Sequence, residues 1–328
     1  MTRVLDCSIR DGGHLNKWDF DPSLVARTYQ AAGTGGIHAF EVGYRFSGII
    51  KDMGPFGYCE DVFLAKLLHR RERVLLTVMI DAGKAEVSLF RNKKESPIDM
   101  VRVAAYPDDL EVALCQVEAL KEKGYKVCLN PMASPELKKE HFQIMEEWKG
   151  KEMLEALYIA DSFGTYSPSD IPVEVGKFRD IGFTRIGFHA HNNLQMAVAN
   201  TLAAIDCGVD WVDATAFGIG RGAGNAPMEI LLGLLNRRDG YKFNELPYIR
   251  LGNSSYQELC RNLKCTPRSE TIMGGLKNVH PYYLDELVER NVETGRIWEL
   301  LDRVRKECPV SYSKHALQNM LSEDNPCE

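Results

Sequence analysis

The sequence predicts an α/β barrel of the (β/α)8 type, a TIM barrel, with a C-terminal helical appendage. The 328 residues fall within the roughly 200 to 400 residues that one such barrel spans with additions. Short apolar runs rich in β-branched residues alternate with amphipathic segments of helical length, a pattern that requires parallel strands joined by crossover helices. Eight strands are expected, near Arg3–Ser8, His38–Gly43, Val74–Ile80, Met100–Ala104, Lys126–Asn130, Ala156–Ala160, Arg185–His189 and Trp211–Thr215.

Proline and capping residues between these strands indicate where helices begin. A Ser or Asp side chain accepts a hydrogen bond from the free N–H groups of a first helical turn, and proline fits the first helical position. Helix starts are expected at Asp21-Pro22, Pro107-Asp108-Asp109, Ser134-Pro135-Glu136 and Ser167-Pro168-Ser169.

The alternation of strands and helices stops after Arg238. Residues 1–238 are therefore expected to form the barrel, and residues 239–328 a helical region that covers the barrel mouth. The aromatic run His280-Pro-Tyr-Tyr283 is expected to fold back over that mouth. Helices in this region are expected near Ser255–Leu263, Tyr283–Arg290 and Thr294–Lys306.

The composition is that of a soluble globular protein, with 45% hydrophobic and 26% charged residues. No segment approaches the ~18 apolar residues of a membrane helix, and the start resembles a strand rather than a signal peptide, so we expect a cytoplasmic protein without a membrane partner. The net charge of −6 argues against a nucleic-acid partner and for a small molecule. Nine cysteines without a CxxC pair support neither a zinc ribbon nor a disulfide framework.

Two histidines, His189 and His191, stand at the end of the seventh predicted strand. Side chains at positions i and i+2 of a strand point to the same face, so both imidazoles can reach one metal ion. A pair of capping or core histidines is the structural alternative.

Further polar residues follow other predicted strands, and in a TIM barrel the active site lies at this end of the strands. The first strand runs into Ser8-Ile-Arg-Asp-Gly-Gly-His14, the second contains Glu41, and the sixth ends in Asp161-Ser162. Asp11 with the two histidines makes a set of nitrogen and oxygen ligands that suits Mn²⁺, Mg²⁺, Zn²⁺ or Fe²⁺.

The eighth strand runs into a glycine-rich segment, Gly218-Ile-Gly-Arg-Gly-Ala-Gly-Asn225, which satisfies a loose dinucleotide-loop pattern. Such a loop should follow the first strand of a βαβ unit, with an acidic residue about 20 positions further on. We therefore interpret the segment as a tight turn that brings backbone close to the site and presents Asn225 inward. A turn with a purely structural role is the alternative.

Three motifs in this order resemble one family. Arg10-Asp-Gly at the first strand, His189-Ala-His-Asn-Asn193 at the seventh and Gly222-Ala-Gly-Asn-Ala-Pro-Met-Glu229 after the eighth resemble the metallolyase barrels, the HMGL-like superfamily, over about residues 1–238. That superfamily includes 4-hydroxy-2-oxovalerate aldolase, isopropylmalate synthase, homocitrate synthase and hydroxymethylglutaryl-CoA lyase. The resemblance implies a divalent metal held by Asp11, His189 and His191, with Asn225 as a further ligand. Mn²⁺ is the expected metal; Mg²⁺, Zn²⁺, Co²⁺ and Fe²⁺ are alternatives.

Details of the motifs resemble the aldolase branch, that is, the class II pyruvate aldolases. Condensing enzymes usually have Arg-Asp-Gly-Glu-Gln, whereas this chain has Arg-Asp-Gly-Gly-His, and in the aldolases a histidine at the position of His14 is the catalytic base. The loop between Thr215 and Asn225 lacks the cysteine of the hydroxymethylglutaryl-CoA lyases. The end of the fifth strand, Leu129-Asn-Pro-Met-Ala133, lacks the lysine of the biotin-dependent carboxyltransferases.

The resemblance implies an aldolase that cleaves or forms a 4-hydroxy-2-oxo acid, from pyruvate and an aldehyde, through a metal-stabilised pyruvate enolate. Arg10 would stabilise the enolate oxygen and bind the substrate, His14 would take the C4 hydroxyl proton, and Glu41 would hold Arg10. Ser162 would bind the substrate carboxylate. A structural Arg–Glu pair and a helix-capping serine are the alternatives for Glu41 and Ser162.

The C-terminal part departs from the aldolase pattern. Where those aldolases carry a tyrosine that acts on the substrate, the stretch Val279-His-Pro-Tyr-Tyr-Leu284 places His280, which we assign to substrate binding. No likeness to the region that docks a partner aldehyde dehydrogenase is evident, and we expect a homo-oligomer, a dimer. Two other functions stay open: a Claisen-type condensing enzyme joining an acyl-CoA to a 2-oxo acid, and a non-catalytic metal-binding scaffold.

Overall fold

The computed structural model describes residues 1–69, 73–265, 267–308 and 310–323, and a closed barrel of eight parallel strands forms its centre. Each strand pairs with the next along the chain, and β8 pairs with β1. The strands are β1 (Arg3–Asp6), β2 (Ala39–Tyr44), β3 (Leu75–Asp81), β4 (Met100–Ala105), β5 (Lys126–Pro131), β6 (Ala156–Asp161), β7 (Ile186–Ala190) and β8 (Trp211–Ala214). The predicted fold class is confirmed, and the predicted strand ends differ from the observed ones by at most two residues.

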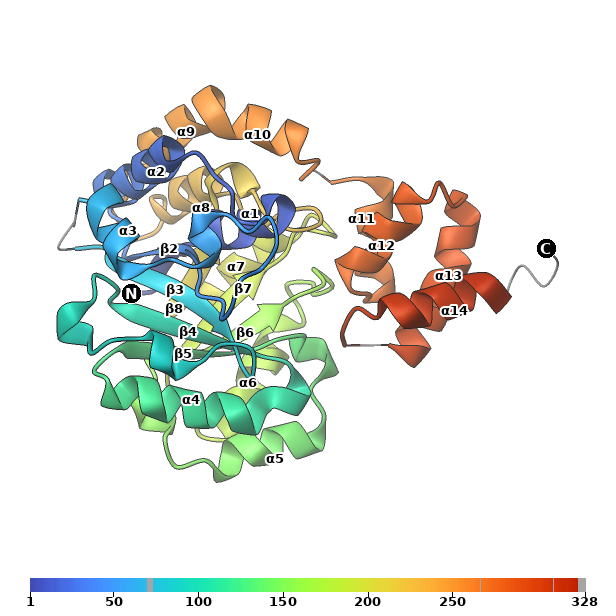
Figure 1. The fold of residues 1–328 in the computed structure, drawn as a ribbon, viewed down its shortest axis with the longest axis horizontal. Coiled ribbons are helices and arrows are strands. Elements are labelled where there is room, and N and C mark those ends of the chain that lie inside the picture. The colour runs from blue at the N-terminus through green and yellow to red at the C-terminus, as the bar shows by residue number, and fades with distance from the viewer. Residues whose placement is uncertain (70–72, 266, 309, 324–328) are drawn as a thin grey trace.

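Helices surround the barrel (Figure 1). They are α1 (Ser8–Asn16), α2 (Pro22–Gly35), α3 (Asp61–Leu67), α4 (Leu110–Glu122), α5 (Lys139–Glu147), α6 (Ile171–Asp180), α7 (Ala197–Asp206) and α8 (Met228–Leu235). The start of α2 is confirmed, because the Asp21 carboxylate accepts a hydrogen bond from the backbone N–H of Ser23.

The other three predicted helix starts were a few residues too early. Pro107–Asp109 and Ser134–Glu136 form single 3₁₀ turns, and the α-helices begin only at Leu110 and Lys139. At the second site the extended backbone of Leu137 separates the turn from the helix. Similarly, α6 begins only at Ile171, after a turn in which Asp170 accepts hydrogen bonds from Ser167.

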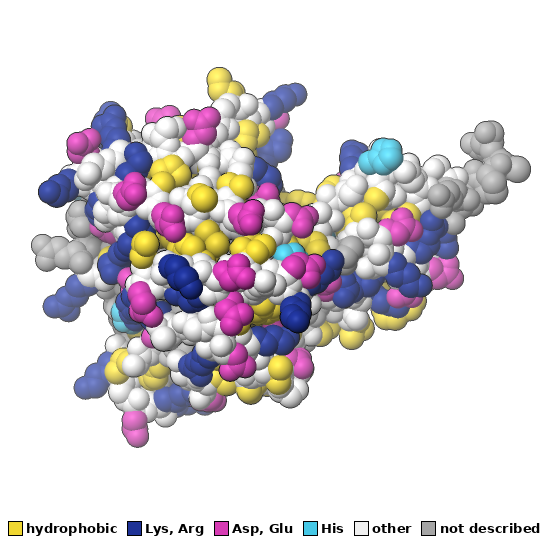
Figure 2. Space-filling model, turned by 90° about the horizontal axis from the view of Figure 1, so that it is seen from below, with side chains coloured by type: hydrophobic (Ala, Val, Ile, Leu, Met, Phe, Trp, Pro, Cys, Tyr) yellow, Lys and Arg dark blue, Asp and Glu magenta, His cyan; other side chains and the backbone are white. Residues whose placement is uncertain are grey.

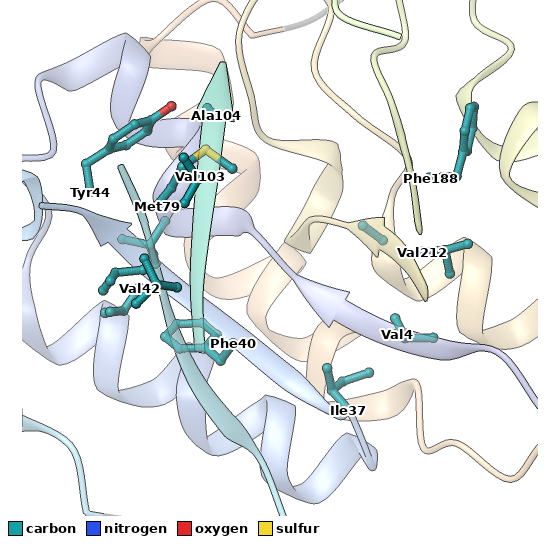
Figure 3. Close-up of a cluster of buried hydrophobic side chains, with 14 of the residues drawn as sticks. Val4, Ile37, Phe40, Val42, Tyr44, Met79, Val103, Ala104, Phe188 and Val212 are labelled. Carbon is teal, nitrogen blue, oxygen red and sulfur yellow. The ribbon is translucent and has the colours of Figure 1, made fainter. Parts of the chain in front are cut away.

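Side chains alternate along each strand, and this alternation divides the barrel into two apolar layers and one polar layer. Outward-facing residues such as Val4, Phe40 and Val212 belong to the large core between strands and helices, part of which Figure 3 shows. A small apolar cluster lies in the barrel interior, and all its members except Cys7, which follows β1, lie on the strands: Leu5, Cys7, Ala39, Met100, Cys128, Ala156, Tyr158 and Trp211. Two positions further along their strands, the inward-facing residues include Glu41, Arg102 and Asp213. All three are buried.

The helices after Arg238 form two groups, and three of them, α9, α11 and α14, were not predicted. They are α9 (Leu246–Leu251), a π-helical turn (Gly252–Tyr256), α10 (Gln257–Asn262), α11 (Ser269–Lys277), α12 (Pro281–Glu289), α13 (Thr294–Glu307) and α14 (Lys314–Glu323). The first group packs on the barrel: α9 contacts α2, and Tyr248 belongs to the main core. Helices α11 to α14 form a group beside the barrel (Figure 1). They share a separate apolar cluster that includes Leu287 and Leu300. Residues 324–328 lie outside the described residues.

Helix α11 packs closely on α12 and on the loop after β7. A Cβ atom on Gly274 would approach Leu284 of α12, and one on Gly275 would approach Leu194 of the loop, to within 3 Å, so neither glycine can be replaced without movement. Asn193 donates a hydrogen bond to the carbonyl oxygen of Thr271. Because paired glycines lower helix propensity, α11 has no clear helical signature in the sequence.

Figure 2 shows acidic and basic side chains interspersed over the face of the molecule that it presents, with no large field of one sign. Among the described residues, none of the helices combines the length and the apolar character needed to cross a bilayer.

Candidate active site

The four predicted metal ligands lie together at the carboxyl ends of the strands. Asp11 lies on the first turns of α1, which begins two residues after β1 ends, His189 on β7, and His191 one residue beyond that strand. Ligand atoms of these three residues lie within 4.8 Å of one another. Asn225 joins them from the loop after β8, where its Nδ2 donates to Asp11 Oδ2 at 2.5 Å.

The polar atoms of this group fit a cation. His189 Nε2, His191 Nδ1 and Asn225 Oδ1 are buried and have no hydrogen-bond partner within the described part of the chain. Leaving such atoms unsatisfied costs roughly 1–3 kcal/mol each. Burial lowers the pKa of His191 to about 3, which leaves its imidazole neutral and able to act as a ligand. Two imidazoles, a carboxylate and an amide oxygen are a donor set that suits a divalent metal ion.

Gly220 permits the close approach of the loop after β8. A Cβ atom at this position would lie 2.1 Å from Asn225 Nδ2 and 2.4 Å from Asp11 Oδ2. The loop turns back at Gly222 and Gly224, both in the left-handed region with φ of +63° and +81°. The segment therefore forms the tight turn that presents Asn225 inward, as predicted.

A chain of buried ion pairs lies beneath the ligands. Glu41 Oε2 accepts from Arg10 Nε at 2.8 Å and from Arg102 Nη1 at 2.9 Å. Arg102 Nη2 donates to Asp213 Oδ2 at 2.7 Å, and the same oxygen lies 2.9 Å from His189 Nδ1. Since a carboxylate at this position only accepts, Nδ1 carries the proton and Nε2 presents its lone pair to the ligand group.

Sequence reasoning missed Arg102 and Asp213, although a signal was present. Each is a single charged residue within an otherwise apolar strand, Met100–Ala105 and Trp211–Ala214. A charge at an inward-facing position of a barrel strand needs a partner inside the barrel. Here the two residues are partners of each other.

Cys7, His189 and Asp213 form a second group with the spacing of metal ligands. This group fits a metal less well, because the Asp213 carboxylate already pairs with Arg102 and His189 Nδ1 bears a proton. Burial raises the pKa of the Cys7 thiol well above its usual value, whereas a metal needs the thiolate.

Above the ligands lies a cavity of about 260 Å³ that opens to solvent. Its walls come from the ends of several strands and from α12. The lining residues are His14, Trp18, Tyr44, Phe46, Asp81, Ala82, Lys84, Ala104, Tyr106, Asp109, Met132, Arg221, His280 and Tyr282.

His14 lies in the wall of this cavity, held by aromatic contacts. Its ring centroid is 4.7 Å from that of Trp18 and 5.7 Å from that of Tyr44, both edge to face. The Tyr282 hydroxyl lies 3.4 Å from His14 Nδ1. Burial and the positive charge of Arg221 hold the pKa of His14 well below its usual value, so the ring is neutral at neutral pH and can accept a proton.

His280 reaches the cavity, but Tyr282 is the residue of this segment that touches His14. The His280 ring caps α12 by accepting a hydrogen bond from the backbone N–H of Tyr282, and its centroid lies 6.0 Å from that of Phe163. Sequence reasoning compared only His280 with the tyrosine of the aldolases and missed Tyr282. Pro281 occupies the first position of α12, and both neighbours, His280 and Tyr282, line the cavity.

Of the residues predicted for catalysis and substrate binding, His14 and His280 line the cavity, whereas Arg10, Glu41 and Ser162 do not. The Ser162 side chain has another partner. Its hydroxyl oxygen accepts a hydrogen bond from the backbone N–H of Ala133 and so ties the loops after β5 and β6 together. The role of Ser162 in binding a carboxylate stays a prediction.

Comparison with known proteins gives a consistent result. The chain matches the HMGL-like family over residues 2–250. It is 31% identical to 4-hydroxy-2-oxovalerate aldolase of Thermus thermophilus over 242 residues, which are 71% of this chain and 68% of the relative. It is 29% identical to oxaloacetate decarboxylase of Mycobacterium tuberculosis over 238 residues, 72% of this chain and 70% of the relative.

Solved structures resemble the chain as well. The N-terminal domain of a putative aldolase from Bacteroides vulgatus superposes with a TM-score of 0.80 at 26% identity, covering 91% of this chain and 99% of that one. The carboxyl transferase domain of Rhizobium etli pyruvate carboxylase has a TM-score of 0.69 at 16% identity, covering 98% of this chain and 60% of that one, a likeness of fold. The chain belongs to the HMGL-like family and is a lyase.

Proposed function

We propose that this lyase is a divalent-metal-dependent aldolase that cleaves or forms a 4-hydroxy-2-oxo acid, with pyruvate and an aldehyde as the two fragments. The observation that carries the proposal is the convergence of unpartnered buried ligand atoms on Asp11, beneath a cavity whose wall holds a neutral histidine. The aldolase relatives support the same assignment.

In the cleavage direction, the predicted catalytic residues and metal ligands have defined tasks. His14 takes the proton of the C4 hydroxyl, the C3–C4 bond breaks, and its electron pair passes to the pyruvate fragment as the enolate while the aldehyde leaves. The guanidinium of Arg10, held by Glu41 and Asp11, offers its remaining N–H groups to the developing negative charge. A divalent cation, when bound by Asp11, His189, His191 and Asn225, would supply Lewis-acid polarisation of the 2-oxo group.

Further residues act indirectly, by positioning the catalytic residues and the metal ligands. Asp213 fixes the tautomer of His189, and Arg102 holds both Asp213 and Glu41, so Arg102 and Asp213 are positioning residues. Tyr282, by its contact with His14, orients the base and stays available to the substrate hydroxyl. We also propose that residues 239–328 cover the barrel mouth, with α12 providing the part of the cover that meets the substrate.

Oxaloacetate decarboxylation is a second candidate, named by the mycobacterial relative. It breaks the C3–C4 bond toward the same enolate but releases carbon dioxide from a carboxylate, so it requires no base for a hydroxyl. Loss of the His14 side chain should therefore impair aldol cleavage but not decarboxylation.

Claisen-type condensation is the third candidate function. Release of a free thiol from an acyl-CoA would reveal it.

The decisive experiment measures aldol cleavage, oxaloacetate decarboxylation and pyruvate methyl exchange with D₂O for wild type and His14→Ala, with Mn²⁺ present. We expect the alanine variant to lose about 10² or more in aldol cleavage, the usual weight of a positioned base, and to retain bound metal. Normal cleavage by the variant, or thiol release without pyruvate exchange by wild type, would contradict the aldolase assignment. The second candidate would be favoured if wild type decarboxylated oxaloacetate but cleaved no aldol substrate, and if His14→Ala decarboxylated oxaloacetate at the wild-type rate.

A further inference from the structure

Arg221 differs from the other buried arginines among the described residues. Arg10, Arg45 and Arg102 are 0–4% exposed, and each forms at least one ion pair with a carboxylate. Arg221 is 5% exposed, yet no carboxylate or other acceptor within the described chain contacts its side chain, and its Nε has no hydrogen-bond partner. A buried guanidinium without a partner is costly, and proteins retain such groups where a ligand completes them.

The guanidinium of Arg221 lies in the cavity above the ligand group. Its backbone N–H donates to Asp11 Oδ2 at 3.4 Å, which anchors the residue beside the ligands, and its side chain lines the cavity. Together with burial, its charge lowers the pKa values of His14 and His280, as expected of a cation close to both rings. The hydroxyl-bearing rings of Tyr44, Tyr106 and Tyr282 line the same cavity.

The charges beneath the cavity are already balanced without Arg221. The network of Arg10 and Arg102 with Asp11, Glu41 and Asp213 has two guanidinium groups and three carboxylates, hence one net negative charge. A divalent cation would make it one net positive charge, which the single carboxylate of a 2-oxo acid would neutralise. At the rim, Lys84 Nζ lies 3.5 Å from Asp81 Oδ2, and the carboxylate of Asp109, which also lines the cavity, forms no ion pair with Arg221. Arg221 therefore has capacity for a second anionic group.

The position of His14 indicates which substrate fragment carries that group. In the proposed function, on which this inference rests, Arg10 and the ligand group bind the pyruvate fragment, and His14 faces the C4 hydroxyl. A cation close to His14 on the cavity side therefore faces atoms beyond C4, which belong to the aldehyde. We propose that Arg221 binds an anionic group, a carboxylate or a phosphate, on the aldehyde fragment, so that the substrate is an acidic aldehyde. The guanidinium fork suits either group.

The kinetic test compares aldehydes that differ in one terminal group, with pyruvate and Mn²⁺ present. Succinic semialdehyde replaces the methyl of butanal by a carboxylate, and glycolaldehyde phosphate adds a phosphate to glycolaldehyde. We expect wild type to prefer the acidic member of at least one pair by about 10-fold or more in kcat/KM. Arg221→Gln should lower kcat/KM for that aldehyde by about 30-fold or more and for its neutral counterpart by less than about 3-fold. The pair with the larger loss identifies carboxylate or phosphate.

Two further variants and a binding measurement complete the test. Arg221→Lys should give an intermediate loss, whereas Arg237→Gln, which removes one exposed charge outside the cavity, should leave both pairs unchanged. In calorimetry, protein saturated with Mn²⁺ and oxalate, which blocks the pyruvate half, should bind propionate or inorganic phosphate, and Arg221→Gln should lose this binding.

The outcomes separate this inference from the proposed function. If pyruvate exchange and aldol turnover occur but wild type prefers the neutral aldehydes, or if Arg221→Gln affects both members of a pair equally, the acidic-aldehyde assignment is wrong and the aldolase assignment stands. If neither exchange nor turnover occurs, the proposed function is wrong. In that case calorimetry alone tests the anion site. The site is overturned if wild type binds neither propionate nor inorganic phosphate, or if Arg221→Gln binds them as wild type does.

Discussion

Two layers of the site differ in how their charges are satisfied. The floor, defined as Arg10, Glu41, Arg102, Asp213 and His189, lies on α1 and the strands, and each of its charged groups is paired. The roof, defined as His14, Arg221, His280 and Tyr282, lies on the end of α1, the loop after β8 and α12, and its guanidinium is unpaired. Rigid strands hold groups whose positions must not change, and loops and an added helix supply groups that wait for a substrate.

The largest effect is expected at the two proposed histidine ligands, His189 of the floor and His191 next to it. His189→Ala and His191→Ala each remove one of the few protein ligands, so stoichiometric metal and turnover should both be lost. Metal content measured by elemental analysis of the purified variants checks this, with folding monitored by circular dichroism. A variant that kept full metal occupancy and full activity would show that the metal lies elsewhere.

Stability should separate floor from roof even without substrate. Arg102→Met leaves Glu41 and Asp213 buried without their shared partner, so the free energy of unfolding should fall by about 3–5 kcal/mol, the usual cost of breaking a buried pair. Arg221→Met leaves no buried carboxylate without its partner, so the free energy of unfolding should fall by less than about 1 kcal/mol or should rise. Urea unfolding of both variants measures the difference, and equal losses would mean that Arg221 has a structural role after all.

A smaller effect is expected for the residue that orients a ligand. Asp213→Asn keeps the shape but weakens the charge that fixes His189 Nδ1–H, so metal affinity should fall by about 10- to 100-fold. Competition with a metallochromic chelator measures this affinity. If affinity were unchanged, the contact between Asp213 and His189 would serve only the ion pair with Arg102.

The smallest effect is a shift of pH dependence in the roof. Because burial and Arg221 lower the pKa of His14, the base stays unprotonated as the pH falls through the usual histidine range, and aldol cleavage should decline only at more acidic pH. Arg221→Gln removes the positive charge, so the acid limb of kcat should move to higher pH. Profiles for the two proteins with a neutral aldehyde test the sign, and an unchanged acid limb would mean that the charge of Arg221 does not act on His14.

The comparison of floor and roof also explains which parts could be predicted. All eight strands and the proposed ligands Asp11, His189 and His191 could be located in the sequence, because short apolar runs between helical segments and strand-end position are local properties. Helices α9, α11 and α14 were missed: α9 is short and α11 contains paired glycines, so tertiary packing rather than propensity stabilises them. Ser162 was assigned to the substrate from its strand-end position alone, and the backbone N–H of Ala133 occupies its hydroxyl oxygen.

The sequence by itself determined the barrel, the family and the residues that meet at the carboxyl ends of the strands, because the succession of apolar runs and helical segments and the order of the motifs are local properties of the chain. Only the tertiary structure decided which charges are satisfied. Arg102 meets Asp213 across 111 positions, Tyr282 meets His14 across 268, and Arg221 meets no acceptor within the described residues. Whether a buried charge has a partner depends on distances between residues that are remote in sequence, and barrel closure together with the docking of α12 sets those distances.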